Sequence, residues 1–168
     1  MKNQLFAKNR EKKAYPWLKA IVAIGDGNRV IGSHGKLPWS FPEEYQYYLR
    51  TTKGGECVMA RQTWESDKRT LGRKVYVVSS SMPDDDEVIV LRNFEDLPAP
   101  PSGKTMWVCG GSSAYSFYLP FCSEIYVTHI HGSFSGDAFF PEFEHLFHEK
   151  KVVMDLPEYT AKIYERNE

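Results

Sequence analysis

Short, uninterrupted apolar runs recur along this chain and limit the folds open to it. The first run covers residues 20–24, AIVAI, and ends at a glycine-rich turn, GDGN. An apolar run of this length without polar alternation is typical of a strand buried on both faces of a sheet. Runs of the same kind follow at residues 56–59, 75–78, 88–91, 106–109 and 125–128. Residues 150–154 and 159–164 alternate more strongly and predict a hairpin at a sheet edge.

Helical segments lie between these expected strands. They cover residues 41–52, 62–66, 94–97 and 112–119. Alternation of strands and helices is typical of an α/β fold, in which helices cover the faces of one sheet. A chain of 168 residues that is 42% hydrophobic can build one domain with a substantial core. We therefore expect an α/β domain.

Composition excludes several classes of partner. The formal net charge is −1, which gives no reason to expect nucleic acid or a membrane surface as a partner. No apolar run approaches the roughly 18 residues that cross a bilayer. The three cysteines, Cys57, Cys109 and Cys122, have no CxxC spacing and predict neither a disulfide framework nor a metal site. Buried thiols in a reducing cytoplasm are the expected state.

The first 18 residues form a basic extension ahead of a domain at residues 19–168. Five basic side chains stand there against the single acid Glu11, and no apolar segment marks a secretory signal. A flexible tail or a short added helix is the main expectation. An organelle-targeting peptide is the alternative, although the segment has one arginine and no serine.

The stretch at residues 32–52 is expected to form the lid and floor of a site. A glycine-flanked loop runs into Leu37-Pro38-Trp39, and a helix follows. Ser40 and Glu43 make an S-x-x-E pattern with Pro42 in the first turn. This spacing predicts a capping box at the start of the helix.

Glu44 is the candidate acid of this helix. Tyr47 and Tyr48 follow three and four residues later, so they share its helix face. A carboxylate among aromatic rings is partly desolvated, which raises its pKa and suits it to proton transfer near neutral pH. An ordinary solvated glutamate is the equally open alternative from this segment alone.

Phosphate-binding features follow three of the expected strands. Gly110-Gly111 joins the strand at 106–109 to a helix, and glycine backbone with a helix N-terminus can bind phosphate. The pattern is not G-x-G-x-x-G, so it predicts no Rossmann motif, and alone it equally fits a tight turn. Arg61 opens a helix after the strand at 56–59, and three serines (79–81) follow the next strand. Together they predict a nucleotide at one sheet edge.

In this order and spacing, several short sequences resemble the dihydrofolate reductase family of the bacterial type, from about Lys19 to the C-terminus. They are IVA at 21–23, RVIG at 29–32, LPW at 37–39, TWES at 63–66, GR at 72–73, GG at 110–111 and GDAFFP at 136–141. The resemblance implies a three-layer α/β/α fold around a mixed eight-stranded sheet, mostly parallel with an antiparallel C-terminal edge strand. It implies NADPH-dependent reduction of 7,8-dihydrofolate to tetrahydrofolate for one-carbon metabolism. It also implies a cytoplasmic monomer that binds antifolate inhibitors.

The resemblance assigns roles around the substrate. Glu44 matches the acid that binds the pterin and promotes protonation of N5, while hydride passes from the nicotinamide to C6. Thr128 matches the threonine bonded to this acid, Trp39 would hold a bridging water, and Leu37 would lie in a mobile loop over the nicotinamide. Arg73 matches the arginine that clamps the carboxylate of the glutamate tail. The other substrate positions implied are Val22, Ala23, Tyr48, Leu71, Cys109 and Tyr115.

The resemblance also implies a cofactor site. Gly110 and Gly111 match a cis peptide, and the pyrophosphate would lie beside Ser112 and Ser113. Arg61 would bind the 2′-phosphate and favour NADPH over NADH. The positions implied for the cofactor are Ala23, Ile31, Gly32, Arg61, Gln62, Thr63, Ser79, Ser80, Arg92, Cys109, Gly110, Gly111, Ser112, Ser113, Ala114 and Tyr115.

The chain departs from the family pattern at several of these positions. Glu44 stands where aspartate is common, Tyr48 where phenylalanine is common, and Cys109 where a larger aliphatic residue is common. Ala60 replaces a usual glycine, and the segment at 67–71 is about one residue shorter than usual. We expect the pocket to differ most from its relatives at Glu44 and Tyr48.

Two alternatives to dihydrofolate reduction remain. A reductase for another dihydropterin, such as dihydromonapterin, would need no clamp for a glutamate tail, so Arg73 disfavours it. A non-catalytic module that binds NADPH or folate would not need the acid, so Glu44 disfavours that reading.

Overall fold

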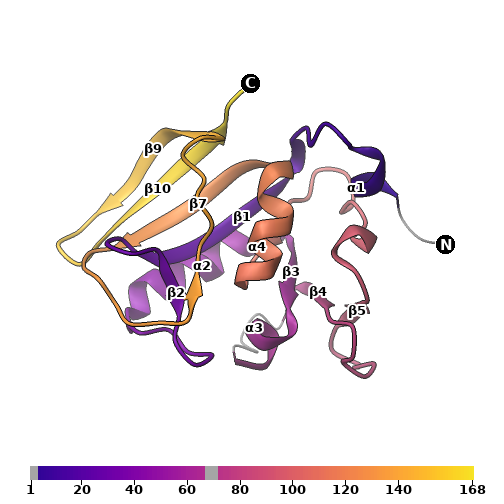
Figure 1. The fold of residues 1–168 in the computed structure, drawn as a ribbon, viewed down its shortest axis with the longest axis horizontal. Coiled ribbons are helices and arrows are strands. Elements are labelled where there is room, and N and C mark those ends of the chain that lie inside the picture. Colours follow the sequence, from indigo (N-terminus) through magenta and orange to yellow (C-terminus); the bar gives the residue numbers. More distant parts are fainter. Residues whose placement is uncertain (1–3, 67–71) are drawn as a thin grey trace.

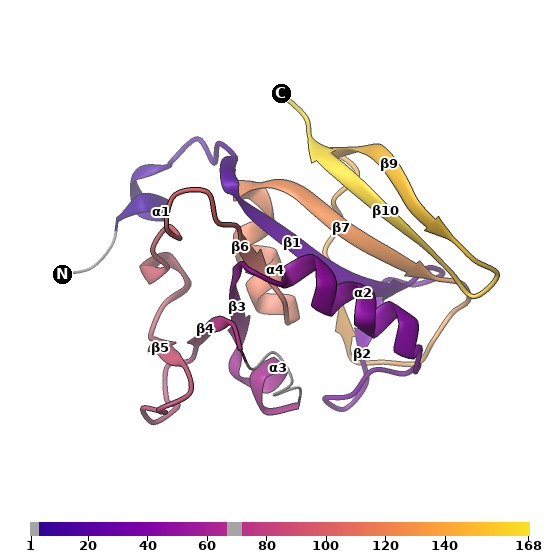
Figure 2. The same ribbon diagram turned by 180° about the vertical axis from the view of Figure 1, so that it is seen from behind.

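An eight-stranded sheet runs through the protein, whose computed structural model describes residues 4–66 and 72–168. Its strands are β1 (Tyr15–Gly25), β3 (Glu56–Ala60), β4 (Lys74–Val78), β5 (Ile89–Leu91), β6 (Met106–Val108), β7 (Cys122–Ile130), β9 (Phe147–Asp155) and β10 (Tyr159–Arg166). Across the sheet they follow the order β5-β4-β3-β6-β1-β7-β10-β9 (Figures 1 and 2). All eight strands expected from the sequence are therefore present.

The pairing of the strands confirms the predicted fold class. The pairs β1–β6, β1–β7, β3–β4, β3–β6 and β4–β5 are parallel. The last strand, β10, runs antiparallel to both β7 and β9. The predicted hairpin forms at the sheet edge, and β9 rather than β10 is its outer strand.

A second, smaller sheet was not expected from the sequence. It pairs β2 (Val30–Gly32) antiparallel with β8 (Ala138–Phe139). Strands of three and two residues are too short to produce a readable hydrophobic alternation. This sheet joins the segment before the Leu37 loop to the segment before Pro141.

The main helices are α2 (Pro42–Thr52), α3 (Arg61–Ser66) and α4 (Ser112–Tyr118). The short ones are α1 (Leu5–Lys8) and the 3₁₀ turns η2 (Phe94–Asp96) and η3 (Leu119–Phe121). The predicted capping box of Ser40 and Glu43 is wrong, because Phe41 is the N-cap of α2 and makes no side-chain capping bond. Glu43 and Glu44 lie in the first turn, where their charge is favourable near the helix N-terminus.

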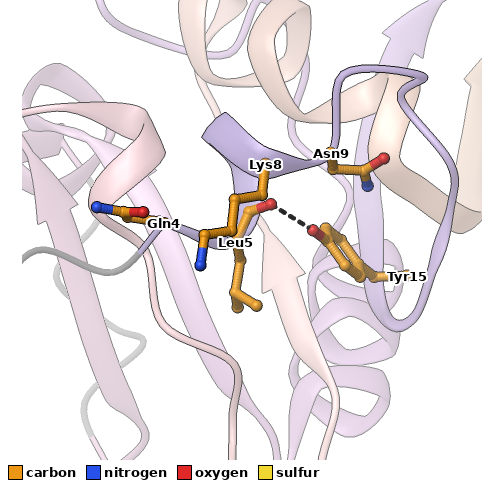
Figure 3. Close-up of a pocket in the computed structure, with 5 residues that line it drawn as sticks. All are labelled: Gln4, Leu5, Lys8, Asn9 and Tyr15. Carbon is orange, nitrogen blue, oxygen red and sulfur yellow. Dashed lines mark hydrogen bonds between the residues drawn. The ribbon is translucent and has the colours of Figure 1, made fainter.

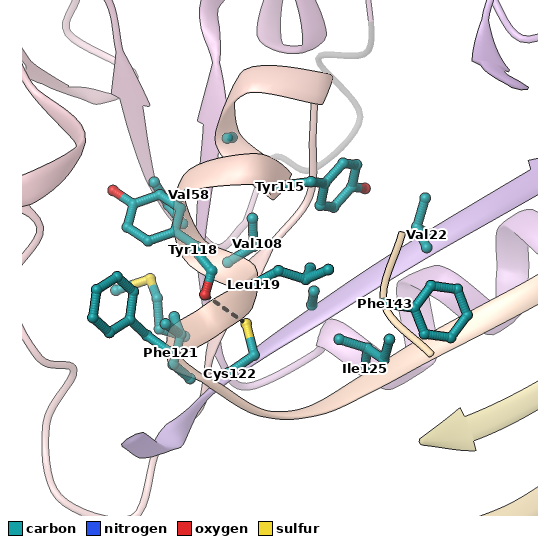
Figure 4. Packing of buried hydrophobic residues seen from close by; sticks show 14 of the residues in the cluster. Val22, Val58, Val108, Tyr115, Tyr118, Leu119, Phe121, Cys122, Ile125 and Phe143 are labelled. Atoms are coloured by element: carbon teal, nitrogen blue, oxygen red, sulfur yellow. Dashed lines mark hydrogen bonds between the residues drawn. The ribbon is translucent and has the colours of Figure 1, made fainter. Parts of the chain in front are cut away.

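The two faces of the sheet carry separate hydrophobic cores. One core contains Val22 of β1 together with Tyr118, the last residue of α4, and Phe121 of η3 (Figure 4). The other contains Ile21 of β1 and packs against Tyr48 of α2. Figures 1 and 2, which are turned by 180°, show α4 and α2 in front of the sheet in turn. The strand at 20–24 is therefore buried on both faces, as predicted.

From Gln4 on, the basic extension is packed against this fold. Strand β1 begins at Tyr15, so the predicted domain boundary after residue 18 falls inside the central sheet. Phe6 of α1 is only 4% exposed and belongs to the core on the α4 face. Among the described residues, no helix is long and apolar enough to cross a membrane.

Candidate active site

Three adjacent strands end together at one edge of the sheet. β4, β3 and β6 are neighbours and run parallel, so their C-terminal ends lie side by side. The Ala60 amide, at the end of β3, donates to the Gly110 carbonyl after β6 at 2.7 Å. The features predicted to bind phosphate, on Arg61, Ser79 and Gly110, are thus brought to the same edge.

The diglycine after β6 packs directly against α3. The Gly110–Gly111 peptide is cis, as the resemblance implied, and Gly110 has a φ of +130°. A Cβ at Gly110 would lie 3.0 Å from Thr63 Oγ1, so a side chain there would be both strained and crowded. The hydroxyl of Ser112 is buried and has no hydrogen-bond partner within the described residues. This arrangement leaves backbone and a hydroxyl available to an anionic ligand.

Two arginines lie on the β4 side of this edge with different partners. Arg61 Nε donates to Glu65 Oε1 at 2.5 Å, one helical turn along α3. Arg92 donates to the carbonyls of Ser79 (3.0 Å) and Met82 (2.7 Å), so it braces the turn after β4. Ser79 Oγ accepts from the backbone of the same turn, whereas Ser80 and Ser81 are exposed.

A loop from β2 reaches across to α3. Ser33 and Lys36 exchange backbone hydrogen bonds of 2.7 and 3.0 Å, which close the loop after Ile31 and Gly32. A Cβ at Gly35 would lie 3.2 Å from Nε2 of Gln62 on α3. Leu37 follows with 55% of its surface exposed. The loop therefore connects the small sheet with the start of α3.

Glu44 lies where helix α2 covers the sheet. Its carboxyl group makes a hydrogen bond with the side chain of Thr128, which is only 2% exposed. Thr128 is paired in register with Ala23 of β1. Burial raises the pKa of Glu44, and the bond to Thr128 offsets part of that rise. The reading of Glu44 as an ordinary solvated glutamate is therefore wrong.

Trp39 lies between the loop and α2. Its ring packs edge-on against Phe134, with 5.1 Å between ring centroids. Its indole Nε1 is buried without a hydrogen-bond partner within residues 4–66 and 72–168. A buried indole N–H normally finds an acceptor, so this group can serve a water or a ligand.

Tyr48, Cys109 and Arg73 lie close enough to interact. The Cys109 thiol makes hydrogen bonds with the side chains of Cys57 and Tyr48 and donates to the Trp107 carbonyl at 3.5 Å. The bond with Cys57 and burial hold the pKa of the Cys109 thiol well above its usual range. Arg73 donates to the Leu49 carbonyl of α2, and its Nε is buried without a partner in the part of the chain described. Leu71, the other residue implied for this region, lies outside the described residues.

Tyr115 and Val22 lie on the other face of β1. The Tyr115 hydroxyl donates to the Ile21 carbonyl at 2.7 Å, and burial raises the pKa of this phenol well above its usual range. Val22 is buried in the same core, and Ala114 precedes Tyr115 with no exposed surface. These contacts fix the first turns of α4 against β1.

Comparison with known proteins gives one consistent family. The sequence profile described as dihydrofolate reductase matches residues 17–162. A dihydrofolate reductase of Bacillus subtilis is 35% identical over 130 residues, covering 74% of this chain and 76% of its own. The chain belongs to the dihydrofolate reductase family. Dihydrofolate reductase type A13 of Escherichia coli is 33% identical over 156 residues, which cover 87% of this chain and 93% of the relative's own length.

A solved structure supports the same conclusion for the fold. The dihydrofolate reductase of Enterococcus faecalis, complexed with NADP(H) and RAB-propyl, superposes with a TM-score of 0.76 at 28% identity. It covers 90% of this chain and 96% of its own. The predicted resemblance to dihydrofolate reductase, with its NADPH-dependent oxidoreductase activity, is confirmed at the level of the family.

Sequence reasoning missed several contacts of this dihydrofolate reductase site. Phe134 against Trp39 and Cys57 against Cys109 join segments far apart in the chain. No local pattern marks such pairs, because Phe134 and Cys57 belong to none of the short motifs in the sequence. The glycine at position 35 was visible in the sequence, but its approach to Gln62 depends on the loop path.

Proposed function

We propose that this protein reduces 7,8-dihydrofolate with NADPH, and that Glu44 is the acid that promotes protonation of pterin N5. The observation that carries the role of Glu44 is its desolvated carboxyl group, bonded to buried Thr128 beside β1. A raised pKa keeps a larger share of the carboxyl protonated near neutral pH, as proton transfer requires. Trp39 Nε1 would hold the water that links this acid to the substrate.

The cofactor fits the edge formed by β4, β3 and β6. NADPH supplies a hydride to pterin C6 when it is bound there. Because Gly110 has no side chain, its backbone can approach a ligand closely. The hydroxyl of Ser112 has no hydrogen-bond partner within the described residues and can donate to a phosphate oxygen. The residues that we assign to the cofactor are Ala23, Ile31, Gly32, Arg61, Gln62, Thr63, Ser79, Ser80, Arg92, Cys109, Gly110, Gly111, Ser112, Ser113, Ala114 and Tyr115.

The glutamate tail of the substrate is assigned to Arg73. Its bond to the Leu49 carbonyl fixes the guanidinium beside α2, and its buried Nε remains available. A planar guanidinium binds a carboxylate through two parallel hydrogen bonds. Tyr48 and Cys109 would face the pterin and benzoyl rings between Arg73 and Glu44. This arrangement favours dihydrofolate over a dihydropterin without a tail.

We extend the proposal to partners and location. Antifolate inhibitors would occupy the same pocket, and the protein would act as a monomer in the cytoplasm. Cys57, Cys109 and Cys122 are free thiols in the structure, which suits a reducing compartment.

Turnover with two substrates tests the proposed function. The oxidation of NADPH is followed optically with dihydrofolate and, separately, with dihydromonapterin. We expect dihydrofolate to be preferred. A preference for dihydromonapterin would indicate the other dihydropterin reductase, and folded protein without activity on either substrate would indicate a binding module.

Replacing Arg61 with Ala should weaken the binding of NADPH much more than the binding of NADH. Only NADPH carries the 2′-phosphate that the guanidinium would bind, so we expect its KM to rise about tenfold to a hundredfold. The KM for NADH should stay within about twofold, since NADH has no 2′-phosphate for the guanidinium to bind. Steady-state kinetics with each cofactor measure both values.

Arg50→Ala is the matched control for this prediction. It removes the same charge from the exposed side of α2 and should change neither KM. An equal loss for NADPH and NADH in Arg61→Ala would reject the 2′-phosphate role.

A further inference from the structure

The N-terminal extension is anchored by Phe6, whose ring fills a socket of aromatic side chains. Two walls of the socket come from the start of β1 and three from the end of α4 and η3. The five rings and their centroid distances from Phe6 are Tyr15 (5.4 Å), Trp17 (6.3 Å), Phe117 (5.9 Å), Tyr118 (5.4 Å) and Phe121 (5.0 Å). All five contacts are edge-on, the geometry that aromatic pairs prefer.

Polar contacts also hold the described part of the extension, from Gln4 on, in place. Tyr15 donates its hydroxyl to the Leu5 carbonyl at 2.7 Å (Figure 3). Arg166 Nη1, at the end of β10, donates to the carbonyls of Lys12 (3.3 Å) and Pro120 (2.5 Å). Beside these contacts lies a cavity of about 370 Å³ lined by Gln4, Leu5, Lys8, Asn9 and Tyr15 (Figure 3). Helix α1 is therefore held by the ring of Phe6 and by the hydrogen bond to its Leu5 carbonyl, while Gln4, Lys8 and Asn9 line the cavity.

Helix α4 connects this socket with the proposed cofactor site. Its last residues, Phe117 and Tyr118, form part of the socket, whereas its first residue, Ser112, lies at the diglycine. The Tyr118 hydroxyl donates to the Phe94 carbonyl at 2.5 Å. At a rise of about 1.5 Å per residue, the two ends of this helix are roughly 9 Å apart. A helix so short behaves as one body, so a tilt at Tyr118 about the Tyr115–Ile21 contact would displace Ser112.

We propose that Phe6 is a positioning residue for the cofactor, because it fixes the tilt of α4 and thereby the place of Ser112 and Ser113. The inference rests on the proposed cofactor site at this end of α4. The family match begins at residue 17, so Phe6 lies outside the segment shared with the family profile. The extension would thus add a contact that supports cofactor binding from outside residues 17–162, the segment that matches the family profile.

Phe6→Ala in the full chain tests this proposal. We expect the Kd for NADPH, measured by calorimetry, to rise about threefold to thirtyfold. The kcat at saturating NADPH and the KM for dihydrofolate should stay within about twofold, because Glu44 and Arg73 are on the opposite face of the sheet. A role in stability alone would lower Tm without this split between the two ligands.

Phe147→Ala is the matched control. Phe147 is as buried as Phe6 and belongs to the same core, but it opens β9 at the outer edge of the sheet. This variant should lower Tm by a similar amount while leaving the Kd for NADPH unchanged. An equal rise of Kd in both variants would overturn the proposal, and so would an unchanged Kd in folded Phe6→Ala.

Phe6→Leu covers the case in which Phe6→Ala does not fold. Leucine keeps apolar bulk but removes the ring contacts. The Kd for NADPH should therefore be higher than that of the unmodified chain and lower than that of Phe6→Ala. If Phe6→Ala does not fold, the comparison with the unmodified chain decides. An unchanged Kd in this variant would overturn the proposal. Failure of the unmodified chain to bind NADPH would instead reject the proposed function, which separates the two results.

Discussion

Replacing Glu44 with Gln should lower the rate of dihydrofolate reduction at neutral pH by about a hundredfold to ten-thousandfold. The amide keeps the shape of the carboxyl group and can still bond with Thr128, but it cannot supply a proton. The loss should shrink as pH falls, because the substrate is then protonated by solvent. A pH profile of kcat for both proteins measures this convergence.

The same substitution should stabilise the protein without ligands. Burial raises the pKa of Glu44, so the folded state binds this proton more tightly than the unfolded state does. Stability therefore falls as pH rises through the interval between the ordinary and the raised pKa, and the ionised carboxylate is a cost at neutral pH. Gln removes this cost, so we expect a higher Tm at neutral pH and a smaller gain in acid.

Glu43→Gln is the control for both measurements. Glu43 precedes Glu44 in the first turn of α2 and is exposed, so the same change of charge should leave kcat and its pH profile unaltered. An unchanged rate for Glu44→Gln at neutral pH would reject Glu44 as the acid. A lower Tm would show that its carboxylate is not strained by burial.

Replacing Arg73 with Ala should raise the KM for dihydrofolate by about a hundredfold or more. The variant loses both arms of the guanidinium that would bind the carboxylate of the tail. The KM for NADPH should not change. Arg73 precedes the first residue of β4, whereas the proposed cofactor edge lies at the C-terminal ends of β4, β3 and β6. Steady-state kinetics with each ligand varied in turn give the two values.

Dihydromonapterin provides an internal control for Arg73. It has no glutamate tail, so its KM should be the same with the unmodified protein and with Arg73→Ala. An equal loss for both substrates would mean that Arg73 supports the pocket through its bond to Leu49 and does not clamp the tail. Arg73→Lys should recover only part of the affinity, because an ammonium group lacks the planar fork.

The sequence predicted the inner strands of the sheet well, because they are buried on both faces and read as continuous apolar runs. The more exposed hairpin of β9 and β10 was instead located from its stronger alternation. Strand β1 was the exception, since it starts at Tyr15 and its first residues include Pro16 and Lys19, which interrupt the run. The order of the strands was not predicted, because local patterns carry no information on which strands pair.

The candidate site was predictable in its positions and not in its contacts. Glycine pairs and helix starts after strands indicated a phosphate edge, and parallel pairing then placed β4, β3 and β6 together. The state of Glu44 could not be read from α2 alone, because the partner that distinguishes it, Thr128, comes from β7. Phe6 was missed for a similar reason, since a single aromatic residue in a basic segment has no periodicity.

The central position of β1 has a consequence for synthesis of the chain. Its neighbours in the sheet are β6 and β7, and neither exists until residues 106–108 and 122–130 have been made. At roughly 5–20 residues per second, the strand waits on the order of ten seconds for its partners. During that time Phe6, Tyr15 and Trp17 have none of the α4 and η3 rings to cover them. The nascent chain therefore exposes the aromatic side chains of Phe6, Tyr15 and Trp17, which favour aggregation, until almost three quarters of the protein has been synthesised.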